Sequence, residues 1–268
     1  MTTLTRTPQE LEQALIDAPG VSLVPTMGAL HSGHISLVRE AQKLGNPVVV
    51  SIFVNPLQFA PGEDLDAYPR TLEEDIAKLE AEGVDAVFAP SVSTMYPHGP
   101  RTTIHPGPLG SVLEGTTRPT HFAGVLTVVA KLFCLTGASD AFFGEKDYQQ
   151  LALIRQMVED LHLPVRVHGC PIIREDSGLA LSSRNRYLSE DEHRTALTLS
   201  RALAAGSYDG ALAVLESADD VDLDYLAVAT PELEELPDGY TGPARLLVAA
   251  KVGQTRLIDN AEIQRSRR

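Results

Sequence analysis

The chain has 268 residues and a mass of 28.9 kDa, and its 36 acidic and 22 basic residues give a formal net charge of −14. Proteins that bind nucleic acid through its phosphates need a surplus of Lys and Arg, and anionic membranes attract basic clusters, so this balance argues against both partners. With 43% apolar residues, the chain has the composition of a globular protein. Residues 201–240 hold ten acidic side chains and one basic one, a net charge of −9.

The cysteines and the N-terminus bear on the cellular compartment. Cys134 and Cys170 each lie inside an apolar stretch, so we expect both to be buried and no disulfide framework to form. No apolar segment reaches the roughly 18 residues that a bilayer crossing requires. The opening residues, MTTLTRTPQELEQAL, contain no apolar signal region. We expect a cytoplasmic protein.

The first two thirds of the chain alternate between strand-like and helix-like segments. Mostly apolar runs predict strands at Val21–Val24 (ended by Pro25), Pro47–Val54, Val84–Ala89 and Asp140–Phe143, of which Pro47–Val54 is also rich in β-branched residues. Apolar residues at helical spacing predict helices from about Gly33, at Thr71–Glu82, at Phe122–Leu135 and at Tyr148–Asp160. Residues 90–120 are rich in Pro and Gly and are expected to form a loop. This alternation predicts an α/β fold with a Rossmann-like, doubly wound parallel sheet.

The pattern changes after about residue 175. Ser189 and Glu192 have the spacing of a capping box that opens a helix to about Ala205, and Thr71 and Glu74 have the same spacing earlier in the chain. Two strands are expected near the end, at Arg245–Val252 and Thr255–Asp259. We therefore predict two domains, a Rossmann-like domain over residues 1–174 and a smaller α+β domain over residues 175–268.

Residues 25–34, PTMGALHSGH, carry the most information about function. They connect a buried strand to a helix, at the sheet edge where open α/β sheets bind ligands. The N-terminus of that helix would present backbone N–H groups and a positive dipole end. His31 and His34 are three residues apart and can face one group, where they would stabilise negative charge on phosphate oxygens. The motif predicts a nucleotide phosphate site.

Other interpretations of the two histidines are a solvated turn and a zinc pair, but no third ligand follows at zinc spacing. With 8 His and 20 Gly in the chain, a His-x-Gly-His string is expected only about 0.02 times by chance. Dinucleotide-dependent redox chemistry is disfavoured because no GxGxxG follows the first strand, and a P-loop is also absent.

Three further clusters lie at or beyond predicted strand ends. In NPLQF, the amides of Asn55 and Gln58 suit the hydroxyl and carboxylate groups of a small substrate, or simply cap a loop. In FGEKDYQQ, Lys146 is a natural phosphate ligand, or a solvated lysine at a helix start. In LSSRNRY, hydroxyls and guanidiniums from residues 182–186 suit a triphosphate clamp, or a capping loop.

Together these segments resemble the pantothenate synthetase family, the pantoate–β-alanine ligases of coenzyme A biosynthesis. The segments that carry the resemblance follow the family's order and are PTMGALHSGH, VVVSIFVNPLQF, EDLDAYPRT, RPTHFAGV, FGEKDYQQLALIR, GLALSSRNRYLS and LLVAAKVGQTRLIDN. The first motif alone would indicate only the HxGH nucleotidyltransferase superfamily.

The resemblance implies an enzyme, an AMP-forming acid–amine ligase. Pantoate would react with ATP to give pantoyl adenylate and pyrophosphate, and β-alanine would then displace AMP to give pantothenate. The family also implies Mg²⁺ with ATP, a homodimer, and a C-terminal lid. The metal ligands are not identified; Glu74 and Asp75 either contribute near the metal or lie on a solvated helix face.

Site residues follow from the same resemblance. The catalytic groups would be His34, as proton donor to the leaving phosphate, with His31, Lys146 and Arg184. Pantoate would be held by Gln58 and Gln150. The residues implied to bind ATP are Met27, Gly28, Ala29, Leu30, His31, Ser32, Gly33, His34, Gly144, Glu145, Lys146, Asp147, Ile173, Leu181, Ser182, Ser183 and Arg184. Arg118 and His121 fall in a segment that looks like the family's mobile gate.

Two other functions remain to be weighed. Another HxGH nucleotidyltransferase acting on a phosphorylated substrate would need further basic residues, whereas Gln58 and Gln150 favour an uncharged polyol with one carboxylate. A nucleotide-binding regulatory module without turnover would not need His34, Lys146 and Arg184 together, since backbone N–H groups suffice for binding.

Overall fold

The computed structural model describes residues 1–60, 62–63 and 65–266. The chain folds into two compact units. The first unit comprises Met1–Glu145 and Gln150–Pro171, and the second comprises Lys146–Gln149 and Ile172–Arg268. The division into domains of residues 1–174 and 175–268 stays a prediction.

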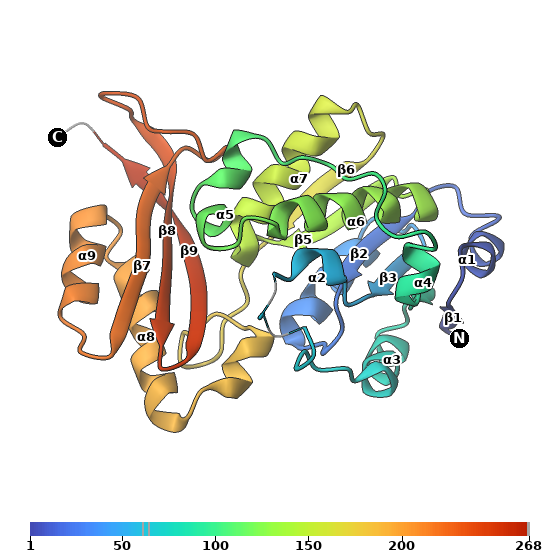
Figure 1. Cartoon of the computed structure of the whole chain (residues 1–268), viewed down its shortest axis with the longest axis horizontal. Coiled ribbons are helices and arrows are strands. Elements are labelled where there is room, and N and C mark those ends of the chain that lie inside the picture. Colours follow the sequence, from blue (N-terminus) through green and yellow to red (C-terminus); the bar gives the residue numbers. More distant parts are fainter. Residues whose placement is uncertain (61, 64, 267–268) are drawn as a thin grey trace. The chain divides into compact units, whose positions relative to one another are not determined.

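The first unit is built on a six-stranded sheet in the order β1-β4-β3-β2-β5-β6, with every neighbouring pair parallel (Figure 1). The expected Rossmann-like parallel sheet is confirmed. Its strands are β1 (Thr3–Thr5), β2 (Ser22–Thr26), β3 (Val48–Ile52), β4 (Ala86–Phe88), β5 (Asp140–Gly144) and β6 (Arg166–Cys170).

Helices cover both faces of this sheet, because successive residues of the central strands point to opposite faces and both sets are apolar. Leu23 and Val49 pack into one core with helices α1, α6 and α7, whereas Val24 and Val50 pack into a second core with α2 and α3. The helices of this unit are α1 (Pro8–Ala14), α2 (Ser32–Gln42), α3 (Leu72–Ala81), α4 (Val92–Met95), α5 (Glu114–Thr117), α6 (His121–Thr136) and α7 (Tyr148–Asp160), the last beginning in the second unit.

Short 3-10 turns complete the connections, η1 (Pro56–Gln58), η2 (Pro108–Ser111), η3 (Glu145–Asp147) and, in the second unit, η4 (Ser183–Tyr187). The expected loop at residues 90–120 therefore contains α4, η2 and α5.

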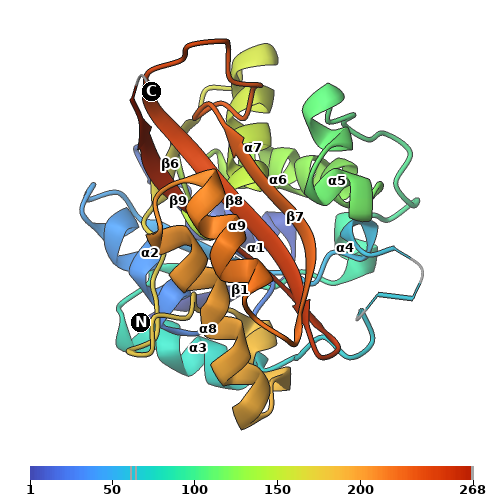
Figure 2. The same ribbon diagram turned by 90° about the vertical axis from the view of Figure 1, so that its left-hand side faces the viewer.

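The second unit has an antiparallel sheet of three strands in the order β7-β8-β9. The strands are β7 (Val221–Ala229), β8 (Gly242–Val252) and β9 (Thr255–Arg265). Helices α8 (Glu190–Ala204) and α9 (Tyr208–Glu216) lie on the same face of it (Figures 1 and 2). Ser189 and Glu192 form the expected capping box at the start of α8.

Three local expectations were wrong. Strand β2 continues through Pro25 to Thr26, where Pro25 is paired in register with Ser51. Thr71 accepts no capping bond from the backbone of its helix; its hydroxyl donates to the side chain of Asp75 in that helix, at 3.1 Å from Oδ2. Cys134 is exposed on α6, whereas Cys170 is buried as expected, and burial raises the pKa of its thiol to about 11.

Among the described residues, no helix combines the length and the apolar composition that a membrane crossing needs.

Candidate functional site

The carboxyl ends of β2, β3 and β5 lie next to one another in the first unit. From β2, the chain continues to β3 and β4 on one side and later to β5 and β6 on the other. Such a reversal of strand order leaves a crevice at the carboxyl edge, where open α/β sheets bind ligands. Met27–His34 follows β2, Asn55–Gln58 follows β3, and Gly144–Glu145 lies at the end of β5. The sheet therefore gathers three of the predicted segments at one edge.

The chain turns sharply after β2 through two residues with positive φ, Gly28 at +84° and Ala29 at +51°. A Cβ at position 28 would lie 3.1 Å from both Asp75 Oδ2 and Ile52 Cγ2, so the turn needs glycine for space as well as for backbone angle. For Ala29 the left-handed conformation costs about 1–2 kcal/mol. Other contacts must therefore stabilise the turn.

The stabilising contacts come from α3. The carboxylate of Asp75, which is 0% exposed, accepts the backbone N–H of Ala29 at 2.8 Å and that of Leu30 at 2.8 Å. Lys78, one turn further along α3, donates to the Leu30 carbonyl at 2.8 Å. Asp75 thus stabilises the loop by accepting hydrogen bonds from its backbone. It does not lie on a solvated face, and both of its carboxylate oxygens are engaged within the protein. Glu74 beside it is exposed.

The two histidines of the motif are tied to the backbone around them. His31 is the N-cap of α2, and its Nδ1 accepts the Gly33 N–H at 3.2 Å. His34 Nδ1 accepts the His31 N–H at 3.3 Å, and the two ring centroids are 4.1 Å apart. A neutral imidazole whose Nδ1 accepts a hydrogen bond carries its hydrogen on Nε2. Both side chains are therefore arranged as Nε2 donors at a helix N-terminus.

Gln58 meets the histidine motif directly. Its side chain is 8% exposed, and its Nε2 donates to Met27 Sδ at 3.0 Å. Its Oε1 accepts from Asn55 Nδ2 at 3.2 Å. The structure thus brings together two of the predicted segments, one after β2 and one after β3, through this pair.

The backbone of Gln58 is held by Arg118, which precedes α6, and by His121, the first residue of α6. The Gln58 carbonyl accepts from His121 Nδ1 at 2.9 Å and from Arg118 Nη2 at 3.3 Å. Arg118 also forms a two-pronged ion pair with Glu63, with Nε–Oε1 at 2.8 Å and Nη2–Oε2 at 2.7 Å. The Arg118 guanidinium lowers the pKa of the Glu63 carboxyl. Arg118 and His121 therefore contact a predicted substrate residue through its main chain.

Gly124 allows α6 to approach this segment. A Cβ on Gly124 would lie 2.3 Å from the Leu57 carbonyl oxygen and 2.6 Å from the Gln58 nitrogen, which backbone atoms cannot accommodate without moving. Gly124 lies inside a strongly apolar helix, and the backbone that it contacts, at Leu57 and Gln58, is more than 60 residues away in the chain. No local pattern in the sequence therefore indicated this close packing.

The remaining predicted residues of the first unit lie on β5 and α7. Gly144 ends β5 and Glu145 begins η3, both half-buried. Gln150 is half-buried on the first turn of α7. Met27 is the residue that joins the histidine motif to Gln58.

In the second unit, Lys146 and Ser182 line one small pocket. The Lys146 carbonyl accepts from Asn260 Nδ2 at 2.9 Å, and Ser182 Oγ accepts the Arg184 N–H at 3.3 Å. The Leu181 N–H donates to the Ile173 carbonyl at 2.9 Å, which places these two predicted residues side by side. Ser183 and Arg184 begin η4 and are half-buried, and Asp147 is exposed.

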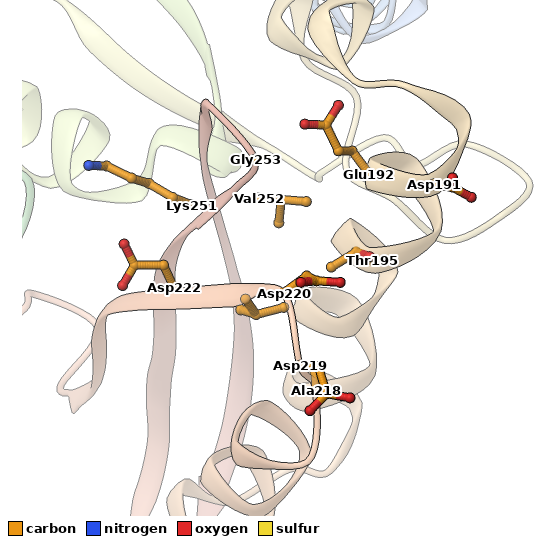
Figure 3. A pocket seen from close by; sticks show the side chains of 11 residues that line it. Asp191, Glu192, Thr195, Ala218, Asp219, Asp220, Asp222, Lys251, Val252 and Gly253 are labelled. Carbon is orange, nitrogen blue, oxygen red and sulfur yellow. The ribbon is translucent and has the colours of Figure 1, made fainter.

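Another pocket of the second unit, of about 510 Å³, is acidic. Figure 3 shows carboxylates around it from the start of α8, from the connection between α9 and β7, and from β7 itself: Asp191, Glu192, Asp219, Asp220 and Asp222. Among the described residues that line it, Lys251 is the one basic side chain. Five carboxylates repel a triphosphate, and none of the predicted site residues lines this pocket.

In the part of the chain that the structure describes, no group of three or more His, Cys, Asp or Glu side chains is placed to hold a metal ion.

Comparisons with known proteins agree on one family. Residues 2–262 match the family model of pantoate-beta-alanine ligase. The pantothenate synthetase of Corynebacterium jeikeium is 63% identical over 254 residues, covering 91% of this chain and 82% of that protein. The pantothenate synthetase of Nocardia farcinica is 59% identical over 253 residues, covering 91% of this chain and 79% of that protein.

Solved structures give the same result. A crystal structure of pantoate-beta-alanine ligase from Thermus thermophilus superposes with a TM-score of 0.92 at 49% identity, covering 97% of this chain and 99% of that one. The enzyme from Francisella tularensis, complexed with beta-gamma ATP and beta-alanine, superposes with a TM-score of 0.83 at 35% identity, covering 97% of each chain. The chain therefore belongs to the pantoate–β-alanine ligase family, whose members form a carbon–nitrogen bond.

Proposed function

We propose that this enzyme condenses pantoate with β-alanine at the expense of ATP, through a pantoyl adenylate, and releases AMP and pyrophosphate. Family membership supports the overall reaction, as does the relative whose structure contains an ATP compound and β-alanine. The observation that carries the proposal is the pair of histidines at the N-terminus of α2, each engaged through Nδ1 with a backbone N–H.

In the first half-reaction, a carboxylate oxygen of pantoate forms a bond to the α-phosphorus of ATP. The bond between that phosphorus and its bridging oxygen to the β-phosphate breaks, and the electron pair leaves with pyrophosphate. Negative charge grows on the leaving oxygens, where the α2 N-terminus and the Nε2 donors of His31 and His34 stabilise it. His34 Nε2 is proposed to donate a hydrogen bond to this leaving group and to keep its hydrogen, because a neutral imidazole that lost it would become an anion.

In the second half-reaction, the amine of β-alanine attacks the acyl carbon of the adenylate. The carbon–nitrogen bond forms, the bond from the acyl carbon to the adenylate oxygen breaks, AMP leaves, and the nitrogen loses its extra proton. An acyl adenylate hydrolyses readily, so the residues that hold pantoate must also keep water from its acyl carbon.

Pantoate binding is assigned to Gln58 and Gln150. Gln58 presents amide N–H groups beside Met27, and such donors suit a carboxylate or hydroxyl oxygen. ATP binding is assigned to Met27–His34 and Gly144–Glu145 of the first unit, and to Lys146, Asp147, Ile173 and Leu181–Arg184 of the second. Lys146 and Arg184 are the proposed cationic partners of the phosphates.

Magnesium fits this assignment only as a companion of ATP. The described residues contain no carboxylate cage, and Mg²⁺ in nucleotide sites is held largely by phosphate oxygens and water. Bound in this way, it would supply neutralising charge to the triphosphate.

Isotope exchange between pyrophosphate and ATP tests the adenylate. Exchange should require pantoate but not β-alanine, and AMP should accumulate only after the amine is added. Exchange in the absence of any acid, or ADP as the product, would contradict the proposal. Replacing pantoate with a phosphorylated acid tests the alternative of another nucleotidyltransferase. Such an enzyme would exchange pyrophosphate faster with the phosphorylated acid than with pantoate.

A further inference from the structure

A chain of buried hydrogen bonds begins at Tyr96, immediately after α4, and ends at Gln58. The Tyr96 side chain is 9% exposed, and its hydroxyl donates to Asn55 Oδ1 at 3.0 Å. The ring is held by Phe53, with 6.3 Å between ring centroids, and by Lys131, whose Nζ lies 5.6 Å from the ring centroid. Burial raises the pKa of the Tyr96 phenol to about 12, so it stays a neutral donor.

The next link, Asn55, has only one orientation that satisfies its neighbours. Its Nδ2 faces the Gly124 carbonyl at 3.0 Å, which can only accept, and its Oδ1 faces the Leu57 N–H at 3.3 Å, which can only donate. The second hydrogen of Nδ2 goes to Gln58 Oε1, and the second lone pair of Oδ1 accepts from Tyr96. All four hydrogen-bonding positions of this amide, which is 1% exposed, are therefore filled within the protein.

The last link fixes how Gln58 meets its surroundings. Because Gln58 Oε1 accepts from Asn55, its Nε2 must point the other way, toward Met27 Sδ at 3.0 Å. A thioether is a weak acceptor, so an oxygen of a ligand would be a better partner for these N–H groups. A reversed amide would present an acceptor there and would repel a carboxylate.

We propose that Tyr96 is a positioning residue for pantoate: its hydroxyl, acting through Asn55, holds the Gln58 amide with Nε2 turned toward the substrate oxygens. This inference rests on the proposed function of Gln58. Without the hydroxyl, Asn55 Oδ1 keeps only the Leu57 N–H at 3.3 Å, so the Asn55 side chain, although its amide is not reversed, is held less firmly against Gln58. The 3.2 Å hydrogen bond to Gln58 Oε1 is then weakened, and with it the preference for one orientation of the Gln58 amide.

The variant Tyr96→Phe removes the hydroxyl and keeps the ring. We expect the KM for pantoate to rise about 5–20-fold, the worth of one buried hydrogen bond to a small ligand, with the KM values for ATP and β-alanine within about twofold of wild type. A matched control is Thr136→Val, which removes a different buried hydroxyl, one on α6 that donates to the Leu132 carbonyl of its own helix at 2.8 Å. It should change Tm without changing any KM.

A double variant separates action through Gln58 from a general loss of packing. In a Gln58→Ala background, the added Tyr96→Phe change should leave the KM for pantoate unaltered, because the group that Tyr96 positions is gone. Multiplied effects in the double variant, an unchanged pantoate KM in the single variant, or a parallel rise of all three KM values would each overturn the inference. A wild-type enzyme that turns over without pantoate would instead overturn the proposed function.

Discussion

His34 accepts the backbone N–H of His31 through its Nδ1 atom, at 3.3 Å. Because Nδ1 acts as the acceptor in this bond, the hydrogen of the neutral His34 ring is on Nε2. The same geometry fixes the ring against the start of α2, so the donor would need no reorientation to meet the proposed phosphate.

Three replacements of His34 test its role, and two of them, to Gln and to Asn, distinguish its two nitrogens. His34→Ala should slow adenylate formation by about 10²–10⁴, the usual contribution of one acid–base or oxyanion group. His34→Gln, whose amide nitrogen falls near the position of Nε2, should retain more activity than His34→Asn, whose polar atoms reach only the position of Nδ1. Single-turnover measurement of adenylate formation gives the rates, and circular dichroism checks the fold. A loss of less than threefold in His34→Ala would remove this residue from the mechanism.

Asp75 is expected to control ATP binding without touching ATP. In Asp75→Asn, an amide NH₂ replaces one acceptor of the Ala29 and Leu30 N–H groups, so two donors face each other in a buried place. The expected cost is about 1–3 kcal/mol of unfolding free energy, with a higher KM for ATP and a smaller change for β-alanine. The exposed neighbour Glu73 provides the control, since Glu73→Gln should alter neither quantity. An unchanged ATP KM in Asp75→Asn would show that the loop holds its shape without this carboxylate.

Gly124→Ala tests the close approach of α6 to the Gln58 segment. The added methyl cannot fit against the Leu57 carbonyl, so the segment must move, at a cost of about 1–3 kcal/mol and with a raised KM for pantoate. Ala130→Gly on the same helix should cost about 1 kcal/mol through helix propensity and leave the pantoate KM unchanged. Denaturant unfolding and steady-state kinetics measure both effects. Equal pantoate KM values in the two variants would contradict the packing argument.

The pH dependence of the protein's stability should depend on Asp140, the first residue of β5, at the end of that strand away from the candidate site. Hydrogen bonds from Arg166, His168 and Ser139 lower the pKa of Asp140 to about 2. A carboxyl whose pKa is lowered by folding adds stability above its ordinary pKa of 3.8, and that stability is lost as the pH falls toward 2.

The variant Asp140→Asn should therefore have a lower Tm than wild type at pH 7, and the difference should shrink between about pH 4 and pH 2. Asp17, an exposed aspartate of the same unit, gives the control, since Asp17→Asn should follow the wild-type profile. A Tm difference that stays constant down to pH 2 would show that the Asp140 charge contributes nothing.

The elements that the sequence predicted are those with a strong local pattern. The run at Val48–Ile52, apolar except for Ser51, and the helical period of Tyr148–Asp160 each specify their structure without help from the rest of the chain. Strand β6 escaped prediction because it lies at the sheet edge and carries polar residues such as Arg166 and His168. Helix α1 did have a signal, the capping box of Thr7 and Glu10, and β7 had an alternating one, which the acidic composition of its segment obscured.

The residues of the candidate site also fall into two groups, those indicated by a local motif and those whose role depends on contacts with distant parts of the chain. Motif spacing and resemblance indicated His31, His34 and Gln58, whose setting at strand ends is local. Asp75 was considered only as a residue near the metal or on a solvated face, and Tyr96 was not predicted, because each acts on a residue more than 40 positions away. A sequence shows which residue types are present at a helix start or a loop end, but a buried hydrogen bond depends on how distant elements pack.

The reliance of the first loop on α3 also bears on the order in which the protein is made. Residues 27–34 leave the ribosome well before residues 72–81, whose Asp75 and Lys78 hold the turn at Ala29 and Leu30. During synthesis, we therefore expect the motif to remain without these contacts for some time, and the proposed nucleotide affinity to arise only when the later helix has folded against it. A nascent chain stalled before that helix emerges should already contain every residue of the histidine motif and yet bind no ATP.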